Sequence, residues 1–169
     1  RPPSPAGRSS SEVSAPVNHG VAIVGYGTMG DYHHRRLAAL GVEVVGVVDI
    51  DPRALDDAAA AGLRPYADLA EALADPSTDF VLIATPNDSH HDIAVAALRA
   101  GKNVLCEKPA TVTSTELIDV VAEAERAGRL FMVHQNRRWD PDYLSMAQVY
   151  AEQLLGPATH IEARVHGSR

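Results

Sequence analysis

The sequence is short of the residues that mark several large classes of protein. Its 169 residues contain one cysteine, Cys106, so no disulfide can form within the chain and disulfide-rich scaffolds are excluded. The single cysteine leaves the redox compartment open and favours the cytoplasm. No apolar run reaches the roughly 18 to 20 residues of a membrane-spanning helix, and the first residues lack the basic-then-apolar pattern of a signal peptide. We therefore expect a soluble globular protein.

The chain also lacks any block of like charge. It has 22 acidic and 15 basic residues, a formal net charge of −7, and only two lysines, Lys102 and Lys108. This balance predicts no nucleic-acid partner, and we expect no membrane partner either. A chain of this length can bury about 70% of its unfolded surface, so we expect one compact domain, and 46% of its residues are apolar.

Composition divides the chain into three segments. Residues 1–18 are rich in proline and serine and nearly free of large apolar side chains, so we expect a disordered tail. Residues 19–140 alternate short apolar runs with helical stretches, and residues 141–169 contain a linking helix and one strand. The continuous runs, each typical of a strand covered on both faces, lie at 21–25, 42–50, 79–86, 103–109 and 130–136.

The stretches between these runs carry signals for helix ends. Asp51 and Asp68 are predicted N-caps, the first of them followed by proline. Thr113 and Glu116 have the spacing of a capping box, and Gly101 follows a helical pattern as a stop signal. Repeated alternation of strand and helix predicts a doubly wound α/β fold with a parallel sheet.

Residues 160–166 follow a different pattern. Ile161, Ala163 and Val165 alternate with polar residues, which is typical of a strand in a one-sided, usually antiparallel sheet. Because no further strand follows to pair with it, we expect the first strand of a truncated second α/β domain. The alternative is an edge strand added to the main sheet.

A glycine-rich turn follows the first apolar run. Residues 25–30 have the spacing G-x-G-x-x-G and open a helix predicted to end near residue 40. This context is typical of a dinucleotide-binding turn, in which the glycines allow a tight turn, the approach of a pyrophosphate and close helix–strand packing. The alternative is a glycine-rich turn without a ligand. The candidate cofactor-binding residues of the turn are Gly25, Gly27, Thr28, Met29 and Gly30.

An acidic residue stands where a dinucleotide-binding fold needs one. Asp49 lies 19 residues beyond Gly30, where a carboxylate would accept hydrogen bonds from the adenosine ribose and repel a 2′-phosphate. Ile50 follows it directly, with no arginine at that position. The spacing predicts NAD in preference to NADP, although Arg53 is near enough to weaken that preference.

Three further motifs carry a resemblance to a known family. One apolar run ends in Ala84-Thr85-Pro86-Asn87 with His90 beyond it, the next ends in Cys106-Glu107-Lys108-Pro109, and the last continues into HQNRRWDPDY at 134–143. Together with the glycine turn, they resemble the Gfo/Idh/MocA family of glucose–fructose oxidoreductases and inositol dehydrogenases. The resemblance covers roughly residues 20–169. Its Glu-Lys-Pro set is the most specific part, and its C-terminal motifs are closest to inositol dehydrogenases.

The resemblance implies an oxidoreductase that acts on CH–OH groups. Members of this family pair an N-terminal Rossmann domain with a C-terminal substrate domain and transfer hydride between NAD(P) and sugars, cyclitols or polyols. It implies that Lys108 is the active-site lysine, that Pro109 follows a cis peptide bond, and that the full-length protein is a homo-oligomer through its C-terminal region. The implied cofactor contacts beyond the glycine turn are Asp49, Ile50, Thr85, Pro86, Asn87, His90, Glu107, Lys108 and Arg138.

One departure from the family bears on activity. The family completes its site with an aspartate and a histidine four positions apart on a helix of the second domain, and this sequence has no such pair. We therefore expect the chain to be the cofactor-binding part of a dehydrogenase, with little or no turnover alone. The alternative is a non-catalytic NAD(H)-binding module, or a subunit that needs a separate substrate domain.

The individual site residues also have plainer interpretations. Lys108 could be a surface lysine, Glu107 could belong to a structural ion pair, and Arg137 and Arg138 could be a solvated pair that supports the following helix. Cys106 is expected to be a small buried apolar residue.

No metal site is expected. The adjacent pairs His33-His34 and His90-His91 lack the i, i+4 spacing of helical metal ligands, and one cysteine gives no zinc spacing. His33 is instead predicted to pack near the glycine turn.

Overall fold

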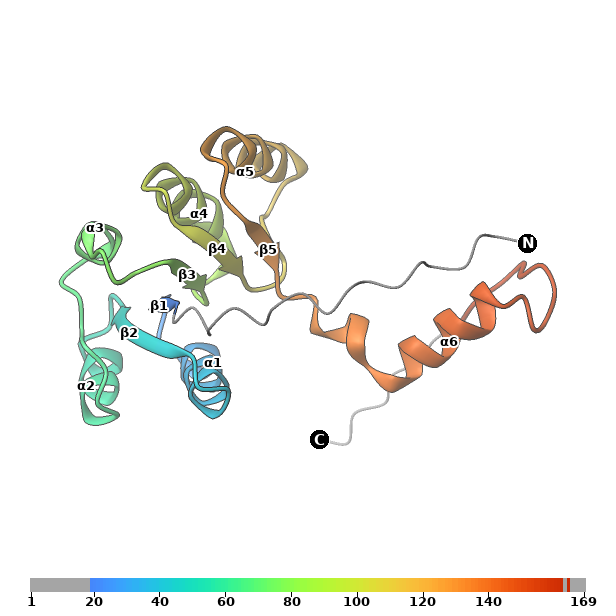
Figure 1. The fold of residues 1–169 in the computed structure, drawn as a ribbon, viewed down its shortest axis with the longest axis horizontal. Helices are drawn as coiled ribbons and strands as arrows, with labels where there is room; N and C mark the ends of the chain where they lie inside the picture. Colours follow the sequence, from blue (N-terminus) through green and yellow to red (C-terminus); the bar gives the residue numbers. More distant parts are fainter. Residues whose placement is uncertain (1–18, 163, 165–169) are drawn as a thin grey trace, which may run out of the picture. The chain divides into compact units, whose positions relative to one another are not determined.

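The computed structural model describes residues 19–162 and 164, which form two compact units that divide between Val133 and His134. The first unit is built on a five-stranded parallel sheet in the order β2-β1-β3-β4-β5 (Figure 1). The predicted doubly wound α/β fold, a Rossmann fold, is confirmed, and every predicted apolar run overlaps a strand. The strands are β1 (Gly20–Val24), β2 (Glu43–Val48), β3 (Phe80–Ile83), β4 (Asn103–Cys106) and β5 (Phe131–Val133).

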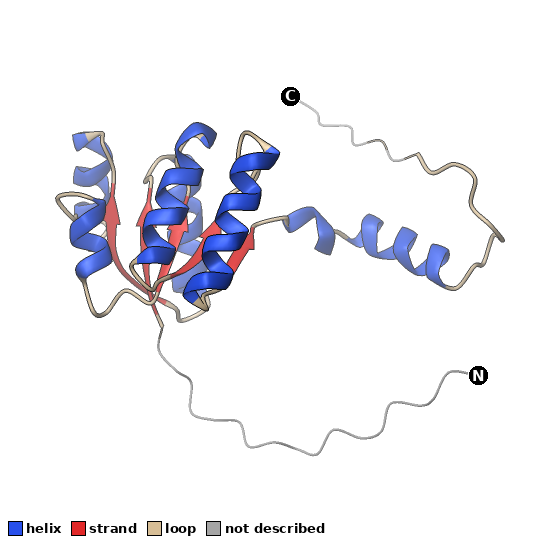
Figure 2. Ribbon diagram, turned by 90° about the horizontal axis from the view of Figure 1, so that it is seen from above, coloured by secondary structure: helices blue, strands red, loops and turns tan. Residues whose placement is uncertain are grey.

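Helices cover both faces of this sheet (Figures 1 and 2). One face packs against α1 (Thr28–Ala39) and α2 (Pro52–Ala60), and the other packs against α3 (Leu69–Ala74), α4 (His90–Arg99) and α5 (Ser114–Ala127).

Neighbouring residues of a strand therefore enter different cores. On β1, Ile23 packs in the core with α1 and α2, whereas Ala22 and Val24 pack in the core with α3, α4 and α5. Burial of a side chain such as Ile23 stabilises the fold by about 1.5–3 kcal/mol. Because both faces are covered, the strands have continuous apolar runs rather than alternating ones.

The predicted helix ends are confirmed. The Asp51 side chain accepts a hydrogen bond from the Arg53 N–H at the start of α2, and the Asp68 side chain accepts one from Glu71 N–H at the start of α3. Thr113 begins α5 with a complete capping box. Each capping side chain satisfies a backbone donor that has no intrahelical partner, which stabilises a helix by about 1 kcal/mol.

The order of the strands positions the candidate site. The chain passes from the interior strand β1 outward to β2 and then returns to the other side of β1 as β3. At such a switch point, the loops after neighbouring strands diverge and leave a crevice at the carboxyl ends of the strands. The loops after β1, β3 and β4 contain the glycine turn, Thr85 and Glu107 respectively.

The second unit consists, in its described part, of the short helix η2 (Asn136–Trp139) and of α6 (Pro141–Ala151). A helix thus lies where the sequence predicts one. The strand predicted over 160–166 is not formed by His160–Glu162 or Arg164, and its remaining residues lie outside the described part of the chain. A strand needs a hydrogen-bonded neighbour, and all five strands of the described residues belong to the first unit.

No helix among residues 19–162 and 164 has both the length and the apolar character that spanning a membrane requires.

Candidate functional site

The glycine turn connects β1 to α1 in the conformation that its spacing predicts. Gly25 has a φ of +91°, and its N–H donates to the Val48 carbonyl at 2.8 Å. A Cβ at Gly25 would approach the backbone of Ala84 and Thr85 to 2.8 Å, and a Cβ at Gly30 would overlap the Gly25 carbonyl oxygen. The first and third glycines of the motif therefore allow the chain to pack tightly on itself.

Gly27 has a different environment. It is the N-cap of α1, and a Cβ built there would meet nothing within 4 Å. The first N–H groups of α1 have no carbonyl one turn earlier to accept their hydrogen bonds, and the helix dipole gives this end a partial positive charge. An open backbone at a helix N-terminus fits a pyrophosphate, so the residues present are compatible with a bound dinucleotide.

Asp49 follows β2 and supports the glycine turn. Its Oδ2 accepts a hydrogen bond from Tyr26 N–H at 2.6 Å, and its Oδ1 accepts one from Asp51 N–H at 2.8 Å. The carboxylate thus holds two loops together, a role that the sequence analysis missed. Each carboxylate oxygen can accept more than one hydrogen bond, so this arrangement is compatible with a ribose hydroxyl as a further donor. Ile50 is fully exposed beside it.

A hollow of about 500 Å³ lies beside the glycine turn. Three carboxylate side chains and one guanidinium, that of Arg53, are part of its lining, and the Asp31 carboxylate forms an ion pair with Arg35. Thr28 lines the hollow, whereas Asp49 and Ile50 do not. The lining residues are Tyr26, Gly27, Thr28, Asp31, Asp51, Arg53, Ala54, Asp57 and Ala61.

The loop after β3 is held from within the protein. Ser89 in the short helix η1 (Asn87–Ser89) donates through its hydroxyl to Thr85 Oγ1 at 2.7 Å. His90 is fully buried, with Nε2 2.9 Å from the Thr85 carbonyl oxygen and Nδ1 2.9 Å from the Pro109 carbonyl oxygen. Both ring nitrogens are therefore engaged by the backbone, so His90 fixes two loops instead of presenting its ring at the surface.

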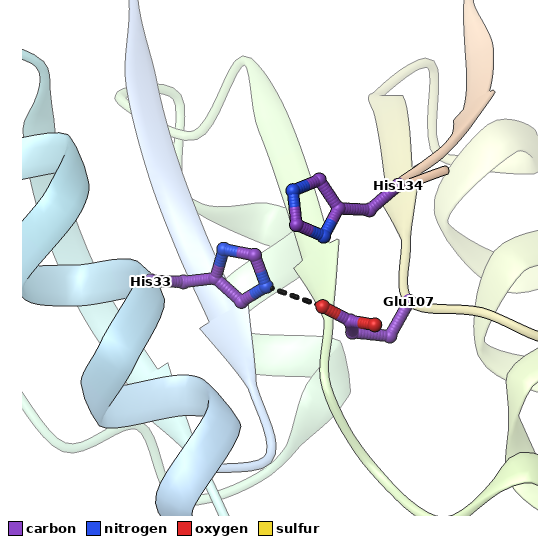
Figure 3. Close-up of side chains that lie close together, drawn as sticks. All are labelled: His33, Glu107 and His134. Carbon is purple, nitrogen blue, oxygen red and sulfur yellow. Dashed lines mark hydrogen bonds and ion pairs between the residues drawn. The ribbon is translucent and has the colours of Figure 1, made fainter. Parts of the chain in front are cut away.

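Glu107 and Lys108 follow β4. Glu107 is only 6% exposed, and its Oε1 lies 2.7 Å from His33 Nε2 of α1 (Figure 3). Its other oxygen, Oε2, accepts a hydrogen bond from the Lys108 N–H at 3.1 Å. Lys108 itself is exposed, and its peptide bond to Pro109 is cis, as predicted.

The environment of this turn agrees with three of the plainer predictions. Glu107 does form a buried, hydrogen-bonded pair with His33, and His33 is indeed buried on the helix of the glycine turn. Cys106 is fully buried at the end of β4, and burial raises the pKa of its thiol to about 12. The contact between His33 and Glu107 could not be predicted from the sequence, because nothing local links residues 74 positions apart.

Two residues of interest, His134 and Arg138, belong to the second unit. His134, also labelled in Figure 3, is its first residue and directly follows β5. Arg138, predicted to contact the cofactor, is exposed in η2.

Comparison with known proteins gives one family. Residues 19–135 match the model of the Gfo/Idh/MocA oxidoreductase family with an NAD-binding Rossmann fold. An inositol 2-dehydrogenase of Mycolicibacterium smegmatis is 44% identical over 155 residues, which cover 86% of this chain and 45% of that protein.

Solved structures agree. An NAD-binding protein from Listeria innocua is 46% identical with a TM-score of 0.78, over 83% of this chain and 42% of that one. GenD2 from gentamicin A biosynthesis, solved in complex with NAD, is 35% identical with a TM-score of 0.76, over 81% of this chain and 40% of that one. The chain thus spans less than half the length of each of these relatives. It belongs to the Gfo/Idh/MocA oxidoreductase family and contains that family's NAD-binding Rossmann domain.

Proposed function

We propose that the chain is the cofactor-binding part of an NAD-dependent dehydrogenase that acts on a secondary hydroxyl of a cyclitol, sugar or related polyol. The main observation that supports this proposal is the convergence of three loops at the carboxyl ends of the strands. The glycine turn, the Thr85 loop and the Glu107–Lys108 turn follow the neighbouring strands β1, β3 and β4. The substrate class is supported by the relatives named inositol 2-dehydrogenase.

The glycine turn and the hollow beside it would hold the adenosine half of the cofactor. Gly27 leaves the backbone open for the pyrophosphate, and Thr28, Met29 and Gly30 supply N–H groups at the start of α1. Asp49 would accept hydrogen bonds from the ribose. The acidic lining of the hollow disfavours a further phosphate on that ribose, so we propose NAD over NADP.

The opposite half of the site would contain the reacting groups. When bound, NAD supplies the nicotinamide ring that accepts a hydride from the carbinol carbon of the substrate. The exposed Lys108 ammonium would donate a hydrogen bond to the substrate oxygen and stabilise the negative charge that develops as the hydroxyl proton passes to a base, which the proposed substrate domain would supply. Glu107 would lie beside the nicotinamide ribose, with Thr85, Pro86 and Asn87 along the cofactor's path.

Calorimetric titration with NADH and NADPH tests this proposal. We expect saturable binding that is at least about tenfold tighter for NADH, because a carboxylate repels a 2′-phosphate. Gly27→Ala should weaken NADH binding by about tenfold or more without lowering the unfolding temperature, since its methyl meets open space in the protein but occupies the path of the phosphates. Glu125→Ala, on the exposed side of α5, is the control and should bind as the parent does.

Two outcomes would contradict the proposal. The first is an absence of binding by either nucleotide at concentrations up to the millimolar range. The second is a Gly27→Ala variant that binds NADH as tightly as the parent chain.

A further inference from the structure

The buried pair of His33 and Glu107 has a role that simple packing does not require. Each residue is 6% exposed, and the two atoms that meet, His33 Nε2 and Glu107 Oε1, are 2.7 Å apart (Figure 3). A carboxylate removed from water costs several kcal/mol unless hydrogen bonds compensate it. An apolar pair of similar volume would fill this space without that cost, so the polar pair calls for an explanation.

The second oxygen of Glu107 supplies the explanation. Its Oε2 accepts a hydrogen bond from the backbone N–H of Lys108, the next residue. The Glu107 backbone N–H is independently held by the Ile83 carbonyl of β3 at 2.9 Å. The sheet therefore fixes the backbone as far as Glu107, and the Glu107 side chain fixes the residue after it.

The other side of the same turn is also held by a histidine. His90 Nδ1 lies 2.9 Å from the carbonyl oxygen of Pro109, and the ring is fully buried. Lys108 thus lies between a residue whose side chain is held by α1 and a residue whose carbonyl is held by α4. Its exposed side chain extends from a backbone that is fixed on both sides.

The position of His33 on α1 connects this turn to the cofactor turn. α1 begins at Thr28, directly after Gly27, and Gly30 in its first turn packs on the Gly25 carbonyl. His33 lies on the next turn of the same helix. One rigid helix therefore contains both the N-terminus proposed for the pyrophosphate and the side chain that holds Glu107.

From these contacts we infer that His33 is a positioning residue: through Glu107 it fixes the backbone of Lys108 relative to the helix that binds the cofactor. The inference rests on the proposed function, which gives Lys108 its chemical role. His33 itself touches neither substrate nor nicotinamide in this account. Its effect is transmitted by the two oxygens of one buried carboxylate.

A pair of substitutions separates positioning from packing. In His33→Gln, a side-chain amide N–H replaces the ring N–H at Nε2, and the two nitrogens are the same number of bonds from Cα. In His33→Phe, a ring remains but the donor is lost. The readout is the hydrogen-exchange rate of single backbone amides by NMR. We expect the Lys108 amide to exchange about tenfold faster in His33→Phe, because a hydrogen bond to a charged group contributes about that factor. In His33→Gln it should stay within about threefold of the parent.

Internal and external controls are available. The Glu107 amide, held by the Ile83 carbonyl, should exchange at the parent rate in both variants. His91→Phe makes the same substitution in a histidine that pairs with Asp92 and Asp119, and it should leave Lys108 unchanged. Should His33→Phe unfold the chain, Glu107→Gln tests the same contact from its other end with a side chain of equal size, and it should also speed Lys108 exchange.

The inference is overturned if the Lys108 amide exchanges at the parent rate in both His33→Phe and Glu107→Gln. It is also overturned if the Lys108 amide of a folded His33→Gln chain exchanges as fast as that of His33→Phe. An NADH titration of the parent chain is read separately. Lack of binding there refutes the proposed function, whereas the exchange rates still report on whether His33 positions Lys108.

Discussion

The two halves of the candidate site are built in different ways. On the adenosine side, small residues let the glycine turn pack closely on neighbouring backbone, the Asp49 carboxylate joins the turn to the start of α2, and these segments surround an open hollow. On the lysine side, buried side chains join distant segments, with contacts from His33 to Glu107 and from His90 to Pro109. The first half depends on residues that are small, and the second depends on residues that are polar and buried.

The largest effect should come from filling a close approach on the adenosine side. Gly30→Val places a side chain against the Gly25 carbonyl and should lower the free energy of unfolding by about 3 kcal/mol. Gly27→Ala, three residues away in open space, should change it by less than about 0.5 kcal/mol. Urea denaturation measures both, and equal stability of the two variants would show that the turn is not tightly packed.

A smaller loss should follow from breaking the lysine side. His90→Phe removes both ring nitrogens from a fully buried position, and with them the N–H that reaches the Thr85 or the Pro109 carbonyl oxygen, so the free energy of unfolding should fall by about 2 kcal/mol. The neighbouring His91→Phe removes only partly exposed ion pairs and should cost less than about 0.5 kcal/mol. A similar loss in both variants would mean that the bridge made by His90 contributes nothing specific.

The smallest expected effect is the slow alkylation of Cys106, which probes the lysine side at the end of β4. Burial raises the pKa of its thiol to about 12, so at neutral pH the thiol is protonated and enclosed at the end of β4. An alkylating reagent should therefore modify the folded chain at a rate set by unfolding, and mild urea should accelerate the reaction in step with unfolding. Rapid modification of the native chain would reveal that this end of the sheet opens by itself.

The same contrast explains what the sequence could predict. Strand positions, the capping box at Thr113 and the turn at 25–30 depend on patterns spanning a few residues, and all were predicted correctly. The link between His33 and Glu107 depends on the folded sheet bringing α1 beside the end of β4, and no local pattern contains it. Asp49 was predicted as a ribose ligand, but its hydrogen bond to the Tyr26 backbone was not, because it forms only when two loops meet.

The predicted strand over 160–166 is instructive for the opposite reason. Alternation of apolar and polar residues is a local signal, but a strand also requires a neighbour to receive its backbone hydrogen bonds. In the described residues His160–Glu162 and Arg164 do not form one. A local pattern is therefore sufficient for a helix cap, whereas alternation alone does not make a strand of His160–Glu162.

The most direct test of the account is whether both halves respond to one molecule of cofactor. Backbone amide shifts of the ¹⁵N-labelled chain would be recorded during titration with NADH. The account predicts that amides of residues 25–30 and of Glu107 and Lys108 shift together and saturate at the same NADH concentration. Shifts confined to the glycine turn, or none in either region, would contradict the claim that these two regions form one dinucleotide site.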